Sequence, residues 1–250
     1  MKQKVYNLII LDESGSMEAI ANEAVSGLNE TLQSIALAQK KHQDQEHYIT
    51  FLTFNSDRIN TVFNRQRVES GKEMQWNKFA PDSCTPLYDA MGQSISELRK
   101  HVNRNDVVLA TIITDGLENA SKEYSGKAIK KMVGSLRKKG WVFVYIGTNQ
   151  DVDAVADGMG IRSRKSYEYS DEGVKRMYRS VNYCRFKMMD DISKYGRKLV
   201  EDEDYDFFES DNSQNNDTDA IDNQAKESKI ARSKTAVGFL SKIRKAIIRF

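Results

Sequence analysis

The hydrophobic pattern changes period repeatedly along the chain, and each change predicts a new strand or helix. Nearly continuous apolar runs over 5–11 and 107–114 predict strands that are covered on both faces. Stretches in which apolar residues recur with the period of a helix turn predict helices. The predicted strands cover 4–11, 47–55, 59–63, 107–114 and 141–146, and the predicted helices cover about 18–40, 86–98, 125–139, 151–158 and 171–195.

Strands and helices alternate along most of the chain, which is typical of an α/β protein with a mostly parallel sheet. We therefore predict a Rossmann-like, doubly wound sheet with helices on both faces. The strands at 47–55 and 59–63 are separated only by a turn-prone segment, so they can form a hairpin. This pair predicts one antiparallel strand at an edge of the otherwise parallel sheet.

The composition changes near residue 200. Residues 201–222 are rich in Asp, Glu, Asn and Ser and have almost no aliphatic side chains, so they cannot bury enough surface to offset the entropy of ordering. From 229 onward the charged residues are basic, and apolar residues recur at helical spacing. We predict an α/β domain over 1–195, an acidic, disordered linker over 196–228 and a basic amphipathic helix over 229–250.

The net charge of +2 argues against a dedicated nucleic-acid binder, and no nucleic-acid partner is expected. No apolar stretch approaches the roughly 20 residues that a membrane span needs. The first residues lead directly into a strand pattern and do not resemble a signal peptide. Two cysteines, Cys84 and Cys184, are too few for a disulfide framework. Together these features predict a cytoplasmic protein.

Five oxygen-bearing side chains occupy positions at which the predicted elements begin or end. Asp12, Ser14 and Ser16 follow the first buried strand, Thr85 precedes the helix at 86–98, and Asp115 follows the strand at 107–114. Ligands of open α/β sheets bind at the carboxyl ends of the strands, so these side chains are expected at one edge.

Hydroxyl and carboxylate oxygens are the ligands that hard cations such as Mg²⁺ prefer, with about six around the ion. Each segment alone is weak evidence for a metal site. Thr85 before Pro86, for example, is also an ordinary way to begin a helix. Their order and their placement at strand ends together predict a site for Mg²⁺ or Mn²⁺. Glu13, inside the first motif, is expected to be a surface carboxylate close to the ion.

The three segments resemble the metal-ion-dependent adhesion site (MIDAS) of von Willebrand factor type A (vWA) domains, in which a distant Thr and a distant Asp complete an Asp-x-Ser-x-Ser motif. The resemblance covers about 4–195 and implies a vWA-like fold. It also implies that Ser14, Ser16 and Thr85 bind the metal directly, while Asp12 and Asp115 often act through water. Cys84 departs from the small residue, often Gly, that commonly precedes the threonine in the family, and we expect it to be a small buried hydrophobe.

The function that the resemblance implies is metal-dependent protein binding, in which an Asp or Glu of a protein partner completes the coordination of the ion. The alternative is a Mg²⁺-dependent phosphohydrolase with Asp12 as nucleophile. Haloacid-dehalogenase-like phosphatases have an Asp-x-Asp motif at this turn, and the second Asp is the general acid/base. This chain has Ser14 at that position, so the general acid/base is missing. No phosphate-binding or dinucleotide-binding glycine motif is present. We therefore predict no catalytic residue, no organic cofactor and no enzyme.

Three other features have more than one interpretation. The basic helix over 229–250 is suited to a peripheral contact with an anionic membrane or an acidic partner, but equally to packing on its own domain or to solvent. The aromatic and basic residues over 165–186 are compatible with nucleic-acid binding, although the spacing favours the core face of a helix. The three histidines, His42, His47 and His101, are predicted at the surface, neither as zinc ligands nor as a base.

Overall fold

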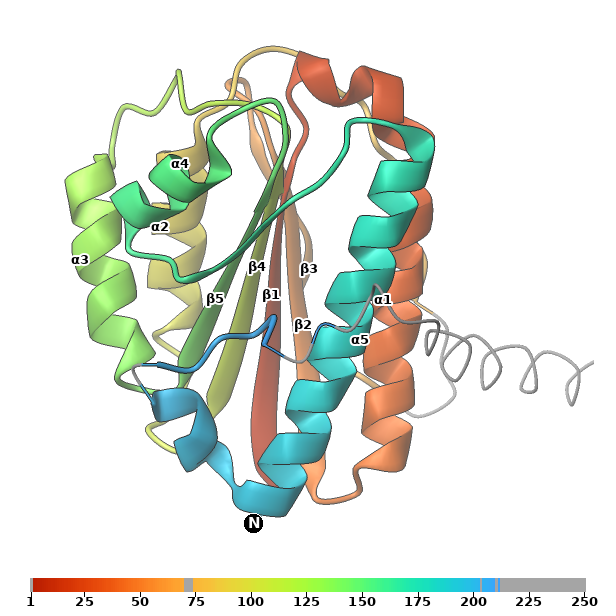
Figure 1. Cartoon of the computed structure of the whole chain (residues 1–250), viewed down its shortest axis with the longest axis vertical. Helices are drawn as coiled ribbons and strands as arrows, with labels where there is room; N and C mark the ends of the chain where they lie inside the picture. The colour runs from red at the N-terminus through yellow and green to blue at the C-terminus, as the bar shows by residue number, and fades with distance from the viewer. Residues whose placement is uncertain (1, 70–73, 203, 210, 212–250) are drawn as a thin grey trace, which may run out of the picture. The chain divides into compact units, whose positions relative to one another are not determined.

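The computed structural model describes residues 2–69, 74–202, 204–209 and 211. These residues form a six-stranded sheet with the strand order β3-β2-β1-β4-β5-β6. All neighbouring strands are parallel except β3, which pairs antiparallel with β2 at the edge. The predicted fold class is confirmed (Figure 1). The strands are β1 (Gln3–Asp12), β2 (Gln45–Phe54), β3 (Ile59–Arg67), β4 (Val107–Thr114), β5 (Trp141–Gly147) and β6 (Ser163–Ser166).

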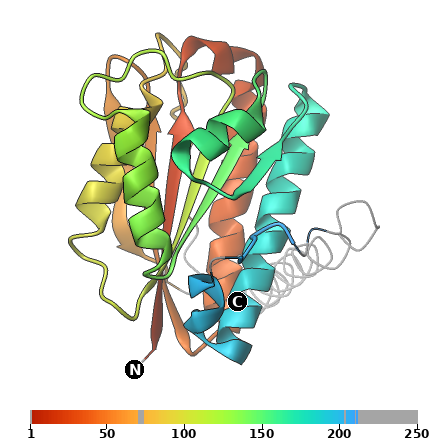
Figure 2. The same cartoon turned by 60° about the vertical axis from the view of Figure 1, so that its left-hand side comes forward.

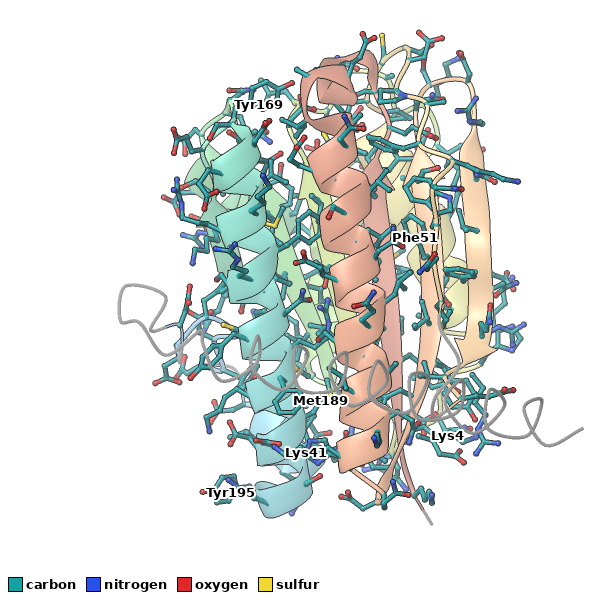
Figure 3. All side chains as sticks on the ribbon, turned by 90° about the vertical axis from the view of Figure 1, so that its right-hand side faces the viewer. Lys4, Lys41, Phe51, Tyr169, Met189 and Tyr195 are labelled. Carbon is teal, nitrogen blue, oxygen red and sulfur yellow. The ribbon has the colours of Figure 1, made fainter. Side chains whose placement is uncertain are left out.

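Helices cover both faces of the sheet (Figures 1 and 2). Helices α1 (Ala21–Lys41) and α5 (Asp171–Tyr195) lie side by side on one face, as Figure 3 shows. Helices α2 (Leu87–Leu98), α3 (Gly126–Arg137) and α4 (Val152–Met159) pack on the other. Two short 3₁₀ helices, η1 (Gly15–Ile20) and η2 (Arg197–Glu201), follow β1 and α5. Among the described residues, no helix has the length and apolar character needed to cross a membrane.

The sheet separates two hydrophobic cores, and β1 contributes to both. Ile9 and Leu11 face the core under α1 and α5, whereas Leu8 and Ile10 face the core under α2, α3 and α4. Successive side chains of a strand point to opposite faces, so a strand between two helical layers needs an apolar residue at every position. This requirement explains the continuous apolar runs of β1 and β4.

The contact between α1 and α5 depends on a glycine. A Cβ atom added to Gly27 of α1 would lie 2.0 Å from the ring of Tyr178 of α5. Only a residue without a side chain allows the ring to lie this close to the helix backbone. Tyr178 is fully buried, in agreement with the interpretation of the 165–186 aromatics as a core face.

The structure differs from the predicted elements at β6 and η1. Strand β6 has the sequence Ser-Arg-Lys-Ser and, within the described part of the chain, pairs with β5 alone. This polar edge strand therefore carries no apolar signal. Helix α1 begins at Ala21, because residues 18–20, the start of the predicted helix, belong to η1 instead.

The packed chain continues beyond the predicted domain end at residue 195. Val200 of η2 and Phe207 are buried in the core under α5, and Tyr205 and Phe208 pack against the same core. The few aliphatic residues of this stretch predicted little burial, but its aromatic side chains provide the buried surface. The remainder of the predicted linker, 212–228, and the predicted basic helix, 229–250, lie outside the described residues.

Two of the three histidines predicted at the surface are buried, so that prediction is wrong for them. His47 lies on β2 with 1% of its surface exposed, and its Nε2 is 3.0 Å from Gln45 Oε1. His42 lies at the end of α1, where its Nε2 is 2.9 Å from Asp190 Oδ1. Burial lowers the pKa of both imidazoles, that of His47 to about 3.

Candidate metal site

The three predicted segments meet at the carboxyl edge of the sheet. Asp12 is the last residue of β1 and Asp115 follows the last residue of β4. These strands are parallel neighbours with Leu11 opposite Ile113, so their ends lie together. Thr85 precedes α2 in a segment that pairs with the same turn, since Gly15 N–H donates to Ser83 O at 3.1 Å. In Figure 1, β1 rises from the amino terminus at the bottom to this edge at the top.

Hydrogen bonds connect four of the predicted residues directly. Ser16 Oγ donates to Asp115 Oδ1 at 2.7 Å and lies 3.3 Å from Ser14 Oγ. The backbone N–H of Ser14 donates to Asp12 Oδ1 at 2.8 Å, and Thr114 Oγ1 donates to Asp12 Oδ2 at 2.5 Å. Both oxygens of Asp12 are therefore oriented by neighbours from β4 and from its own turn.

Thr85 joins the cluster beside Gly116. A Cβ atom at Gly116 would lie 3.1 Å from Thr85 Oγ1, 3.8 Å from Ser16 Oγ and 3.9 Å from Asp12 Oδ2. Three oxygens from two separate stretches of sequence thus lie within 4 Å of one point on a third stretch. The structure brings all five predicted residues together, while their role as metal ligands stays a prediction.

The electrostatics of this cluster suit a cation. Asp12 is fully buried, and burial raises its pKa to about 6, although hydrogen bonds from Thr114 and Ser14 oppose the rise. Burial also raises the pKa of Asp115, whose Oδ2 has no hydrogen-bond partner among the described residues. The groups that act most strongly on these two carboxyls include no Lys, Arg or His of the described chain.

The donor set fits a hard divalent ion. Within the described ranges, no group of three or more His, Cys, Asp or Glu side chains is placed to hold a metal. The cluster at the sheet edge instead combines two carboxylates with three hydroxyls, all oxygen donors. Zinc sites are built mainly from Cys and His, whereas Mg²⁺ takes oxygen ligands and few carboxylates. The residues present therefore fit Mg²⁺ or Mn²⁺ better than Zn²⁺.

The prediction that Glu13 is a surface carboxylate near the ion is wrong. Only 1% of Glu13 is exposed, and its carboxylate accepts from Thr53 Oγ1 at 2.8 Å and from Ala80 N–H at 2.9 Å. Arg58 Nη2 lies 3.3 Å from the same carboxylate. Adjacent residues at a strand end point to opposite faces, so Asp12 and Glu13 cannot both face the cluster. This alternation was the signal that could have placed Glu13 correctly.

The Thr85 segment is also held from the opposite side by the loop after β4. Asn119 Oδ1 accepts from Thr85 N–H at 2.9 Å, and Glu118 Oε2 accepts from Tyr88 N–H at 2.9 Å in the first turn of α2. These acceptors satisfy backbone N–H groups at and before the first turn of α2, which have no partner within the helix. Asp89, which the sequence did not single out, accepts from the N–H groups of 122–124. Cys84, expected to be buried, is exposed.

A third loop reaches the site from the amino end of α5. The hydroxyl of Tyr169 donates to the backbone oxygen of Ser16. Tyr169 is labelled in Figure 3 at the end of α5 that lies beside η1. The first motif is therefore contacted by residues from β4, from the loop before α2 and from the loop before α5.

No family model matches the chain, and no curated protein matches it. Solved structures do resemble it. The PilB minor pilin from Streptococcus sanguinis superposes with a TM-score of 0.56 at 11% identity, over 76% of this chain and 63% of the pilin. The pilus adhesin SpaC from Lactobacillus rhamnosus GG, in an open conformation, has a TM-score of 0.56 at 14% identity, over 76% of this chain and 30% of the adhesin.

A von Willebrand factor type A protein from Catenulispora acidiphila has a TM-score of 0.51 at 12% identity, over 75% of this chain and 42% of that protein. The chain thus spans less than two thirds of each of these three proteins. At such low identity the likeness concerns the fold alone. The domain has a vWA-like fold.

Proposed function

We propose that the chain is a divalent-metal-dependent protein-binding module. The observation that carries the proposal is the convergence of Asp12, Ser16 and Thr85 within 4 Å of one point, with Ser14 and Asp115 hydrogen-bonded to that group. The residues that would hold Mg²⁺ or Mn²⁺ are Asp12, Ser14, Ser16, Thr85 and Asp115.

The five residues would contribute to metal binding in two ways, according to their charge. Ser14, Ser16 and Thr85 offer neutral oxygens, which leave an ion's charge largely uncompensated. Asp12 and Asp115 supply negative charge that burial makes costly unless a cation is near. When bound, the ion would supply a coordination position for a carboxylate from an Asp or Glu of a protein partner. Thr114 and the Ser14 backbone hold Asp12 in one orientation and so reduce the entropic cost of binding.

The comparisons support a binding role at the level of the fold. Two of the similar structures are a minor pilin and a pilus adhesin, and a third is a von Willebrand factor type A protein. An adaptor or adhesion-type role for this chain agrees with that likeness. We propose no catalytic step, since position 14 offers a hydroxyl where a phosphatase of the Asp-x-Asp type needs a second carboxylate. The cytoplasmic location stays a prediction.

A Mn²⁺ titration followed by electron paramagnetic resonance tests the metal site. The wild-type chain should bind Mn²⁺ at one saturable site from which Mg²⁺ displaces it. Ser16→Ala and Thr85→Ala should each weaken binding by at least about tenfold. Ser135→Ala removes an exposed hydroxyl from α3 and is the matched control. Equal affinity in all four proteins would contradict the proposed ligand set.

The partner carboxylate is tested separately with Mn²⁺ as the probe. Water-proton relaxation by the bound ion should fall when a short Asp-containing peptide replaces coordinated water, and an Asn-containing peptide should have no effect. If the chain binds Mn²⁺ but shows no such response, the metal site would stand and coordination of a partner carboxylate would be excluded. Turnover of a phosphate ester with Mg²⁺, lost in Asp12→Asn, would instead revive the phosphohydrolase.

A further inference from the structure

A basic groove lies near the amino ends of β4 and β5, whereas the metal site lies at the carboxyl ends of the strands. It has a volume of about 960 Å³ and runs along α3 toward the loop between α2 and β4, with η2 at one end. Figures 1 and 2 show the carboxyl end of α3 at the same end of the domain as the amino terminus of β1. The groove is therefore separate from the residues proposed to hold the ion.

The lining of the groove has a pronounced excess of positive charge. Among the described residues of the lining, the one acidic residue is Glu201, which is paired with Arg197 at 2.6 Å. Arg99, Arg104, Lys131 and Lys139 are exposed, and their side chains have no carboxylate partner among the described residues. The cationic residues of the lining are Arg99, Arg104, Lys131, Lys138, Lys139 and Arg197.

Helix dipoles account for only part of this charge. Cations near the carboxyl end of α3, such as Lys138 and Lys139, are stabilised by that end of the helix. Lys131 lies in the middle of α3, and Arg104 lies in a loop, so neither has this explanation. The charges of Arg99, Arg104, Lys131 and Lys139, which have no carboxylate partner among the described residues, repel one another, and an anionic partner would remove that repulsion.

The floor of the groove favours an acidic peptide over a single-stranded nucleic acid. Val102, Met132, Leu136 and Trp141 give the lining an apolar component beside the charges. Trp141 is only 2% exposed, so the described lining offers no aromatic surface on which a base could stack. Single-stranded nucleic acids are bound by stacking together with charge, whereas an acidic peptide can place apolar side chains on such a floor.

We propose that this groove binds an acidic polypeptide segment in which Asp or Glu residues are interspersed with apolar residues. The carboxylates pair with Arg104, Lys131 and the neighbouring cations at the rim. The apolar side chains contact Val102 and Met132, and the flexible methionine adapts to their shape. Binding in this groove needs no metal ion, since the groove and the metal site share no residue.

The test uses the full chain and a fluorescein-labelled peptide of four Glu-Glu-Leu repeats, followed by fluorescence polarisation. We expect saturable binding that weakens strongly between about 0.05 M and about 0.5 M salt and persists in EDTA. The double variant Arg104→Glu and Lys131→Glu should weaken binding by at least about tenfold.

The control double variant, Lys78→Glu and Lys175→Glu, makes the same change in net charge at exposed lysines outside the groove. It should bind the peptide nearly as well as the wild-type chain. Equal loss in both double variants, or no wild-type binding at low salt, would overturn the proposal. Tighter binding of an oligothymidine of similar length, lost only in the groove variant, would overturn it in favour of nucleic acid. Circular dichroism of each variant verifies its fold.

Discussion

At the scale of single residues, the site depends on the alternation of neighbours at the end of β1. Asp12 turns toward the hydroxyls of Ser16 and Thr85, and Glu13 turns toward Thr53 and the backbone of Ala80. One carboxylate is thus available to a cation, and the next fastens the segment that precedes Thr85. Two adjacent acidic residues have different roles because a strand reverses its side chains at every step.

Gly116 is expected to be essential for metal binding although it supplies no ligand. In Gly116→Ala the new Cβ would lie 3.1 Å from Thr85 Oγ1, which is closer than most Cβ contacts allow, so the threonine must move. Mn²⁺ affinity should fall by at least about tenfold while the fold survives, as measured by paramagnetic resonance and circular dichroism. Gly158→Ala, where a Cβ would meet nothing within 4 Å, is the control. Unchanged affinity would show that the space beside Gly116 is not required.

Glu13→Ala is expected to destabilise the domain by about 2–4 kcal/mol, because it leaves the buried Thr53 hydroxyl and the Ala80 N–H without their acceptor and Arg58 without its partner. Denaturant unfolding measures the change, and Mn²⁺ affinity should also fall as the Thr85 segment loosens. Glu46→Ala, which removes the exposed ion pair with Arg67, should cost less than about 1 kcal/mol. Comparable losses in the two variants would refute the structural role of Glu13.

At the scale of elements, the domain depends on the close contact of α1 with α5. The ring of Tyr178 occupies the space over Gly27, and the buried residues of both helices form one core with β1, β2 and β4. Helix α5 also leads from the loop that carries Tyr169, whose hydroxyl contacts the Ser16 backbone. The packing of α5 therefore determines where one of the loops around the site is held.

Gly27→Ala is expected to force α1 and α5 apart, since its Cβ would lie 2.0 Å from the Tyr178 ring. Overpacking of this kind costs about 1–3 kcal/mol, so thermal and denaturant unfolding should both show a loss of stability. Gly134→Ala on α3 has open space around the new methyl group and should be neutral or stabilising by up to about 1 kcal/mol. A stable Gly27→Ala protein would mean that the ring moves aside without cost.

The order and type of the main elements could be predicted because burial on both faces leaves a strong signal. The predicted strand at 107–114 coincides with β4, and the alternation of strands with helices indicated the parallel sheet. Strand β6 could not be found, because a polar edge strand pairs through its backbone and has no apolar requirement. The cluster was predicted from residue types at strand ends. The bonds of Glu13, Asp89 and Tyr169 could not be predicted, since their partners lie in loops whose paths the pattern of strands and helices does not determine.

At the scale of the whole domain, polar and charged side chains lie within the layer between the sheet and α5. Arg185 is buried and donates to Asn182 Oδ1 at 2.8 Å and to Thr111 Oγ1 at 3.3 Å, and burial lowers its pKa to about 10. His47 of β2 is also buried, and this cation contributes to its lowered pKa. The His47 imidazole is therefore uncharged in the native structure near neutral pH.

The contribution of His47 to the stability of the domain should consequently fall in mildly acidic solution. Burial lowers the pKa of His47 from 6.5 to about 3 in the folded chain, while the unfolded chain keeps the ordinary value. Between these values the unfolded state binds more protons, so the contribution is constant above pH 6.5 and is lost as the pH falls toward 3. One such group gives a slope of up to about 1.4 kcal/mol per pH unit.

Urea unfolding of the wild-type chain and His47→Gln at several pH values measures this contribution. The variant can keep a hydrogen bond to Gln45 but cannot be protonated, so it should lose less stability than the wild-type chain as the pH falls from about 6.5 to about 5. His101→Gln is the control, because His101 is exposed and its ring nitrogen Nε2 lies 3.5 Å from Glu97 Oε1 at the surface. The wild-type slope should persist in that control. A slope that is the same in His47→Gln as in the wild-type chain would mean that other groups cause the loss of stability in acid.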